Sequence, residues 1–285
     1  MNKKTWITVF LVFFKSEALI GNSVVSLQEA LIAGILQGIL EWLPVSSEGN
    51  LVIFLSGLIG LEPSETLSFV IFLHIGTGLA ALFYFRKEVV SILSMRTEES
   101  RIKLFKLILI TIITGLVGFP IFLFLSLSPL IGEVLLGLTG LALILTVLLQ
   151  KNSEKRGFRQ IQELSWYETL GLGLVQGLSI IPGLSRSGVT TSLLLFRNYE
   201  GKHAFRFSFL MSIPASFAAG LGMMIINDFS VSPEALLSLI SSTVIGYLSI
   251  DILIKIAERT RFWKICILLG IIAIIAFVPY LIHLQ

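Results

Sequence analysis

The chain has 285 residues, of which 55% are apolar and 14% are charged, and its mean hydropathy is +0.92. Soluble domains carry about 25% charged residues, so this composition excludes a water-soluble globule, as well as disordered, collagen-like and nucleic-acid-binding chains. One membrane crossing takes about 20 residues, which limits the chain to about ten crossings. The net charge of +3 suits a membrane protein with basic loops on one side.

The first 25 residues differ from the rest. Lys3 and Lys4 precede a short apolar stretch, which resembles the start of a signal peptide, but no convincing cleavage region follows. We therefore interpret residues 1–25 as a signal-like segment or an extra helix, and we leave them out of the functional reasoning.

Apolar runs along the rest of the chain predict membrane-embedded helices. These runs cover residues 27–43, 51–61, 67–85, 104–125, 130–149, 166–182, 189–196, 205–226, 235–256 and 262–282. Lys and Arg gather in the connections 86–103, 151–165, 197–206 and 255–264, whereas 126–132 and 227–234 contain neither. Because basic loops stay in the cytoplasm, the four basic connections are predicted to lie inside and the other two outside.

This topology requires two segments that enter the membrane and turn back. The chain is inside at 165 and again at 197, yet the run 189–196 is too short to cross alone. We therefore predict a re-entrant hairpin over 166–196, with the sequence PGLSRSG at its tip. A similar hairpin over 27–61 has LPVSSEG at its tip and enters from the outside. Non-helical backbone at membrane depth is tolerated only where protein buries it or where it lines a wet cavity.

The two hairpins also match in sequence. A shift of 139 residues aligns Gln37-Gly38 with Gln176-Gly177, Ser46 with Ser185, and Gly49 with Gly188. Related units that enter from opposite faces form an inverted-topology repeat, with the binding site expected where the broken helices meet. The predicted fold is therefore an all-α polytopic membrane protein with repeats over 26–150 and 151–285. Each repeat is a re-entrant helical hairpin followed by three transmembrane helices.

Two charged side chains stand beside the hairpin breaks. Glu41 and Arg186 lie in otherwise apolar segments, and a charge near the bilayer centre costs about 2.5–3.5 kcal/mol, so such residues usually serve a function. The structural alternatives are a carboxylate at a helix end and a buried ion pair. Gln37 lies four residues before Glu41 on the same helical face, so both side chains can reach one ligand.

The residues that follow each break favour an anion. Each second helix opens with hydroxyl side chains and a glycine, in the sequences Ser46-Ser47-Glu48-Gly49 and Ser185-Arg186-Ser187-Gly188. Hydroxyls and free backbone N–H groups at a helix N-terminus bind anions, and arginine binds phosphate through two hydrogen bonds. Two such helix starts facing one cavity indicate phosphate or diphosphate, against the simpler alternative of ordinary serine capping.

These residues resemble a known family. The stretches QGILEWLPVSSEG (37–49) and PGLSRSG (182–188) are similar to the two motifs of the undecaprenyl-diphosphate phosphatase family (UppP/BacA type), and the similarity extends over about 27–283. The resemblance implies a membrane enzyme that removes the terminal phosphate of a C55-type polyprenyl diphosphate and so recycles the lipid carrier for glycan export. It also implies inverted repeats with two re-entrant hairpins, a plasma-membrane location, a site open to the outer face, and a divalent cation, usually Mg²⁺.

The family motifs also imply roles for individual residues. Ser47 would be the nucleophile, Arg186 the phosphate clamp, and Glu41 with Gln37 would hold the metal or activate the nucleophile. The residues implied in substrate binding are Gln37, Ser46, Glu48, Asn50, Ser185, Ser187, Gly188 and Thr190. The expected partners are the polyprenyl diphosphate lipid and the bilayer, with a homodimer left open.

One position departs from the family pattern. The first loop usually reads SSxGH, whereas Asn50 stands in place of the histidine here. Asparagine cannot transfer a proton at neutral pH, so Glu41 or Glu48 would have to supply that function. Glu48 also adds negative charge beside an anionic substrate, which a metal ion would offset; a diverged substrate or weak activity is the alternative. His74, in the middle of a predicted helix, is interpreted as a polar contact inside the bundle rather than as a site residue.

Two questions stay open on the sequence alone. The attacking group is either Ser47 or a water molecule activated by Glu41. The chain could instead be a polyprenyl-phosphate transporter or flippase, since inverted repeats with broken helices are a transporter architecture. A transporter needs no nucleophile, so it would tolerate Ser47→Ala. A lipid phosphatase of the acid-phosphatase type is excluded because its paired histidine motifs are absent.

Overall fold

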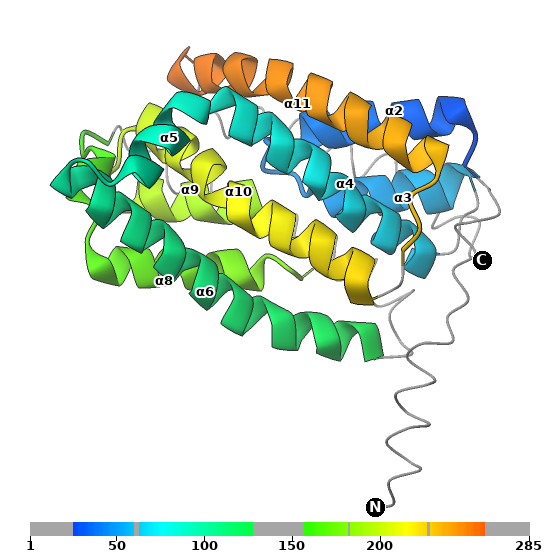
Figure 1. The fold of residues 1–285 in the computed structure, drawn as a ribbon, viewed down its shortest axis with the longest axis horizontal. Coiled ribbons are helices and arrows are strands. Elements are labelled where there is room, and N and C mark those ends of the chain that lie inside the picture. Colours follow the sequence, from blue (N-terminus) through cyan, green and yellow to red (C-terminus); the bar gives the residue numbers. More distant parts are fainter. Residues whose placement is uncertain (1–24, 60–62, 128–156, 182, 227–228, 260–285) are drawn as a thin grey trace, which may run out of the picture.

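The computed structural model describes residues 25–59, 63–127, 157–181, 183–226 and 229–259. Within these ranges the regular elements are helices, with one isolated β-bridge between Arg159 and Tyr199. They are α2 (Leu27–Leu40), α3 (Ser47–Ile59), α4 (Pro63–Tyr84), α5 (Arg86–Ser94), α6 (Glu98–Leu127), η2 (Ile161–Glu163), α8 (Trp166–Leu178), α9 (Arg186–Phe196), α10 (Gly201–Ile226) and α11 (Pro233–Arg259). Figure 1 shows the long helices side by side in one bundle.

Four of these helices, α4, α6, α10 and α11, are long and apolar enough to span a membrane. They coincide with four predicted crossings, so the prediction of an all-α polytopic membrane protein is confirmed. The predicted crossings 130–149 and 262–282 lie outside the described residues, as does almost all of the signal-like segment. The division into repeats at residue 150 therefore stays a prediction. The apolar runs did not predict α5, which is mostly exposed, with Ile92 buried.

The described parts of the basic connections gather at one end of the bundle, where α5 lies beside the start of α6 (Figure 1). Glu88 of α5 forms ion pairs with Lys103 of α6 at 2.5 Å and with Arg206 of α10 at 3.3 Å. We refer to this end as the basic end. The gathering agrees with the charge-based topology, which places these connections on one side of the membrane.

Both predicted hairpins are broken helices. The first breaks between α2 and α3 and the second between α8 and α9, and the tips contain the left-handed residues Ser46 (φ 55°) and Gly183 (φ 92°). In Figure 1, α8 and α9 lie toward the basic end, whereas α2 and α3 lie toward the opposite end. The hairpins thus enter the bundle from opposite ends, which is the geometry that an inverted repeat requires.

Glycines let each hairpin pack closely against a long helix. A Cβ atom on Gly38 of α2 would lie 2.7 Å from the backbone nitrogen of Gly246 in α11. One on Gly173 of α8 would lie 2.7 Å from Cβ of Ile113 in α6. Small residues at these contacts allow the backbones to approach, as in many membrane bundles. The tips are thereby held at fixed positions inside the protein.

A buried carboxylate closes the basic end of the second hairpin. Glu168, in the first turn of α8, accepts hydrogen bonds from Arg159 (2.8 Å), from Arg197 just after α9 (2.8 Å), and from the Tyr199 hydroxyl (2.7 Å). These contacts join the start of α8 to the end of α9. They hold the two arms of the hairpin at a fixed separation.

Candidate active site

The second helix of each hairpin begins with the same serine cap. Ser46 Oγ accepts a hydrogen bond from the Gly49 N–H at 3.3 Å, and Ser185 Oγ accepts one from the Gly188 N–H at 3.2 Å. The shift of 139 residues aligns these two pairs. The next residue in each case begins the helix, so Ser47 and Arg186 stand at matching positions, each at the positive end of a helix dipole.

The two tips are bonded to each other. Ser185 Oγ and Ser187 Oγ both donate to the carbonyl oxygen of Leu43, at 3.2 and 2.9 Å. Leu43 lies in the first tip, 144 positions before Ser187. The binding site was expected where the broken helices meet, and these bonds bring the two breaks together.

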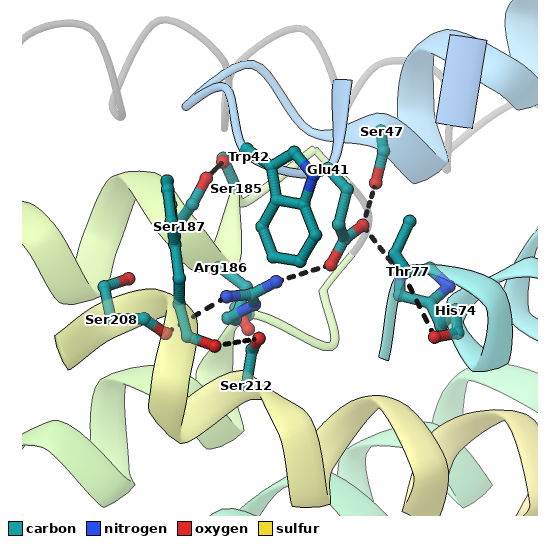
Figure 2. Close-up of polar contacts among 12 residues, drawn as sticks. Glu41, Trp42, Ser47, His74, Thr77, Ser185, Arg186, Ser187, Ser208 and Ser212 are labelled. Carbon is teal, nitrogen blue, oxygen red and sulfur yellow. Dashed lines mark hydrogen bonds and ion pairs between the residues drawn. The ribbon is translucent and has the colours of Figure 1, made fainter. Parts of the chain in front are cut away.

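Glu41 is the centre of the joined tips (Figure 2). Its side chain is buried, and its Oε1 accepts a hydrogen bond from Arg186 Nη2 at 2.5 Å. Its Oε2 accepts hydrogen bonds from Ser47 Oγ at 2.7 Å and from Gln37 Nε2 at 3.0 Å. His74 Nε2 lies 3.3 Å from the same oxygen. The Glu41 carboxylate therefore contacts Arg186, Ser47 and Gln37, the side chains that the family motifs imply act with it.

Arg186 is held on its other side by α10. Its Nη1 donates to the carbonyl oxygen of Ser208 at 3.3 Å, and its guanidinium lies 5.9 Å from the centre of the Trp42 ring. Thr190, one turn further along α9, donates to the Arg186 carbonyl at 2.7 Å and lies 2.6 Å from Ser208 Oγ. The guanidinium is thus fixed in direction, which a phosphate clamp requires.

A cavity of about 280 Å³ lies beside the joined tips. Its polar wall includes Glu41, Ser46, Ser47, Glu48, His74, Ser185 and Arg186. The rest of the wall comes mainly from α6, α8 and α10 and is mostly apolar. Five residues predicted to bind substrate lie outside this wall: Gln37, Asn50, Ser187, Gly188 and Thr190. The hydrogen bonds of these five residues hold the tips and the wall residues in place. Their role in substrate binding stays a prediction.

Asn50 has a structural position in the first tip. Its side-chain amide donates to the carbonyl oxygens of Val45 at 2.6 Å and Ser46 at 2.9 Å. These bonds close the turn at Ser46, the left-handed residue directly before α3. The side chain that replaces the family histidine therefore stabilises the turn that presents Ser47.

His74 brings a histidine into the site from a different element, α4. Its Nδ1 lies 3.0 Å from the Val70 carbonyl oxygen, and its Nε2 lies between Glu41 and Glu48, 3.6 Å from Glu48 Oε1. The sequence interpretation of His74 as an interior contact alone was incomplete, because the side chain also lines the cavity. A polar ring in the middle of an apolar helix was a usable signal, since the same argument had singled out Glu41.

The fit of a metal ion can be tested on the same contacts. The described part of the chain contains no group of three or more His, Cys, Asp or Glu residues arranged to hold a metal. Both oxygens of Glu41 already have protein partners, and Gln37 Oε1, although buried without a partner, belongs to a residue outside the cavity wall. This arrangement does not fit a cation held by Glu41 and Gln37. Glu48 is the carboxylate that lines the cavity with fewer protein contacts.

The fold and the site together define a class of protein. It is a polytopic α-helical membrane protein in which two broken helices join a hydroxyl, a carboxylate and a guanidinium beside one cavity. A hydroxyl hydrogen-bonded to a carboxylate is a nucleophile with its base, and a fixed guanidinium stabilises charge that develops on phosphate oxygens. The arrangement is suited to phosphoryl transfer.

Comparison with known proteins places the chain in a family. The family model described as bacitracin resistance protein BacA matches residues 30–275, and the chain belongs to this family. A relative named undecaprenyl-diphosphatase from Haloarcula marismortui is 36% identical over 253 residues, covering 85% of this chain and 93% of the relative. Relatives of the same name from Methanococcoides burtonii (36% over 261 residues, 88% and 98%) and Saccharolobus solfataricus (36% over 265 residues, 86% and 93%) are similar to it as well.

Proposed function

We propose that the protein is an undecaprenyl-diphosphatase, a membrane enzyme that hydrolyses a polyprenyl diphosphate to the monophosphate and inorganic phosphate. The observation that carries the proposal is the hydrogen bond from Ser47 Oγ to Glu41 Oε2, 2.7 Å long, on the wall of a cavity that Arg186 also lines. The family and the names of its relatives support the same reaction.

In the first step, Ser47 Oγ attacks the terminal phosphorus while Glu41 accepts the hydroxyl proton. The bond from that phosphorus to the bridging oxygen breaks, and the polyprenyl monophosphate leaves with the bonding electrons. Glu41 passes its proton to the departing monophosphate and is a carboxylate again. Water then attacks the phosphoserine while Glu41 takes a proton from it, the bond from phosphorus to Ser47 Oγ breaks, and Ser47 Oγ recovers that proton from Glu41 as inorganic phosphate leaves. Arg186 orients the terminal phosphate and stabilises its equatorial oxygens.

A divalent cation, Mg²⁺, is part of the proposal as a partner of the diphosphate. It would neutralise phosphate charge when bound, and Glu48 is the described side chain best placed to face it. We further propose a plasma-membrane location with the site facing outside. The entry of α2 and α3 from the end opposite the basic connections supports this orientation. A homodimer stays a prediction, which light scattering of the purified protein in detergent would test.

Phosphate release from a C55 diphosphate, measured for the purified protein in detergent with and without Mg²⁺, tests the function. We expect release by the wild type and its loss in Ser47→Ala. Ser212→Ala is the matched control, because Ser212 donates to the Phe209 carbonyl of its own helix and does not line the cavity. Activity that survives in Ser47→Ala would assign the attack to water. No release by the wild type, with lipid binding retained, would overturn the phosphatase in favour of a transporter.

A further inference from the structure

The cavity beside the reaction centre continues between two long helices. Beyond the polar wall it is lined by Thr114, Gly115 and Phe119 of α6 and by Ala219 and Gly222 of α10. Figure 1 shows α6 lying along α8, with α10 on the other side of α6 from the lower edge of the bundle in this view. One continuous cavity therefore joins the charged tips to a mostly apolar passage, which we call the α6–α10 slot.

Among the described residues, nothing packs closely against two glycines of the slot. A Cβ atom on Gly115 or on Gly222 would meet no atom within 4 Å among the described residues. The contrast is Gly177, on the α8 side of the cavity, where a Cβ atom would lie 2.7 Å from Cβ of Val117. Close helix packing explains Gly177, whereas at Gly115 and Gly222 the missing side chain leaves the cavity open.

A second, independent observation indicates that the cavity takes a ligand with a polar end. Gln176 is 3% exposed and lines the cavity where the polar wall meets α6. Its Nε2 donates to Thr114 Oγ1 at 3.1 Å, but its Oε1 is buried without a partner in the described part of the protein. Buried polar atoms are nearly always paired. A ligand in the cavity would pair this oxygen by donating a hydrogen bond, either from a protonated phosphate oxygen or from a water that the head group carries.

We propose that the α6–α10 slot holds the first isoprene units of the substrate and that Gly115 and Gly222 determine which chains fit. The inference rests on the proposed function, because only a substrate with a diphosphate head and an apolar chain needs both ends of this cavity. The head reaches Ser47 and Arg186, Gln176 marks the boundary between head and chain, and the chain leaves between α6 and α10 toward the bilayer. Burial of its methylene groups against apolar walls contributes to binding the long-chain substrate.

Filling the slot tests the proposal. We would measure kcat/KM of Gly115→Leu and Gly222→Leu on a C55 diphosphate and on methyl diphosphate, which carries no isoprene unit to place in the slot. We expect kcat/KM for the C55 substrate to fall at least about tenfold, mainly through KM, and that for methyl diphosphate to change less than twofold. Leu116→Phe and Leu221→Phe add bulk at exposed neighbouring positions and are the controls, with wild-type values expected. Equal losses on both substrates, or no loss on either, would overturn the slot.

A second measurement does not depend on turnover of the short substrate. A C55 diphosphate analogue with a photoreactive diazirine in its first isoprene unit should crosslink the wild-type protein within 111–122 of α6 or 218–226 of α10. Crosslinks confined to other helices would overturn the proposal. Wild-type phosphate release from the C55 substrate is checked first. Its absence would overturn the proposed function, and its presence with misplaced crosslinks would overturn the slot alone.

Discussion

Arg186 Nη2 lies 2.5 Å from Glu41 Oε1, and the two residues are 145 positions apart in the chain. The ion pair joins the tips of two hairpins that enter the bundle from opposite ends. Since Glu41 also accepts a hydrogen bond from the Ser47 hydroxyl, the proposed phosphate clamp and the proposed base are parts of one contact. Disturbing either tip should therefore affect both binding and chemistry.

Arg186→Lys should lower kcat/KM at least about tenfold, because a lysine cannot bond Glu41, the Ser208 carbonyl and a phosphate in one planar arrangement. Arg186→Ala should lose more activity and also stability, by about 3 kcal/mol, since it leaves Glu41 buried without its partner. Phosphate release and thermal unfolding in detergent measure the two effects. A lysine variant with wild-type kinetics would show that the guanidinium fork is not needed.

His74→Ala should lower kcat about tenfold, or about 1.4 kcal/mol, because the variant loses the 3.3 Å contact of His74 Nε2 with Glu41 Oε2. The loss should appear in kcat more than in KM, because His74 contacts Glu41, the proposed base. His203→Ala is the control, since His203 pairs with Glu200 near the start of α10. If His74→Ala retains the wild-type kcat, the ring is only an interior contact.

Glu48→Gln distinguishes two roles for Glu48: binding of Mg²⁺, or electrostatic repulsion of the diphosphate. If Mg²⁺ meets Glu48, the variant should need a higher Mg²⁺ concentration for half-maximal phosphate release, because a neutral amide binds the cation more weakly than a carboxylate. Glu200→Gln, at an exposed position, should leave the Mg²⁺ dependence unchanged. A variant with unchanged Mg²⁺ dependence and a lower KM for the diphosphate would show that Glu48 only repels the substrate.

Glu168→Gln should destabilise the protein by about 3 kcal/mol, because it breaks a buried carboxylate contact with two arginines. The unfolding temperature of the purified variant in detergent measures this loss. Glu163→Gln, half exposed in η2 at the same end of the bundle, should have a smaller effect. Equal unfolding temperatures for the wild type and Glu168→Gln would mean that the second hairpin keeps its geometry without this cluster.

Much of the fold could be predicted because its signals are local. An apolar run of sufficient length becomes a helix in a bilayer, since every backbone group must be satisfied within the segment. For the same reason, the breaks at LPVSSEG and PGLSRSG could be placed from proline, glycine and serine. The surplus of Lys and Arg in a few connections predicted which of them lie together, and Glu88 indeed pairs with Lys103 and Arg206.

Only part of the candidate site could be predicted from the sequence. Glu41, Ser47 and Arg186 stood beside chain breaks, where a charge or a hydroxyl in an apolar setting attracts notice. Asn50 drew attention as the residue that replaces a histidine, yet its amide closes a turn. The histidine that lines the cavity, His74, belongs to α4, and nothing in its neighbours along the chain indicates that it faces Glu41.

The sequence by itself therefore determined the class of protein, the positions of the described membrane helices, the two hairpin breaks and the chemistry of their tips. Each of these depends on residues close together in the chain. Only the tertiary structure decided that Glu41 meets both Arg186 and His74, and that Gly115 and Gly222 face one open slot. These are contacts between segments far apart in sequence, which depend on how whole helices pack, and helix packing depends on side-chain shape over many residues at once.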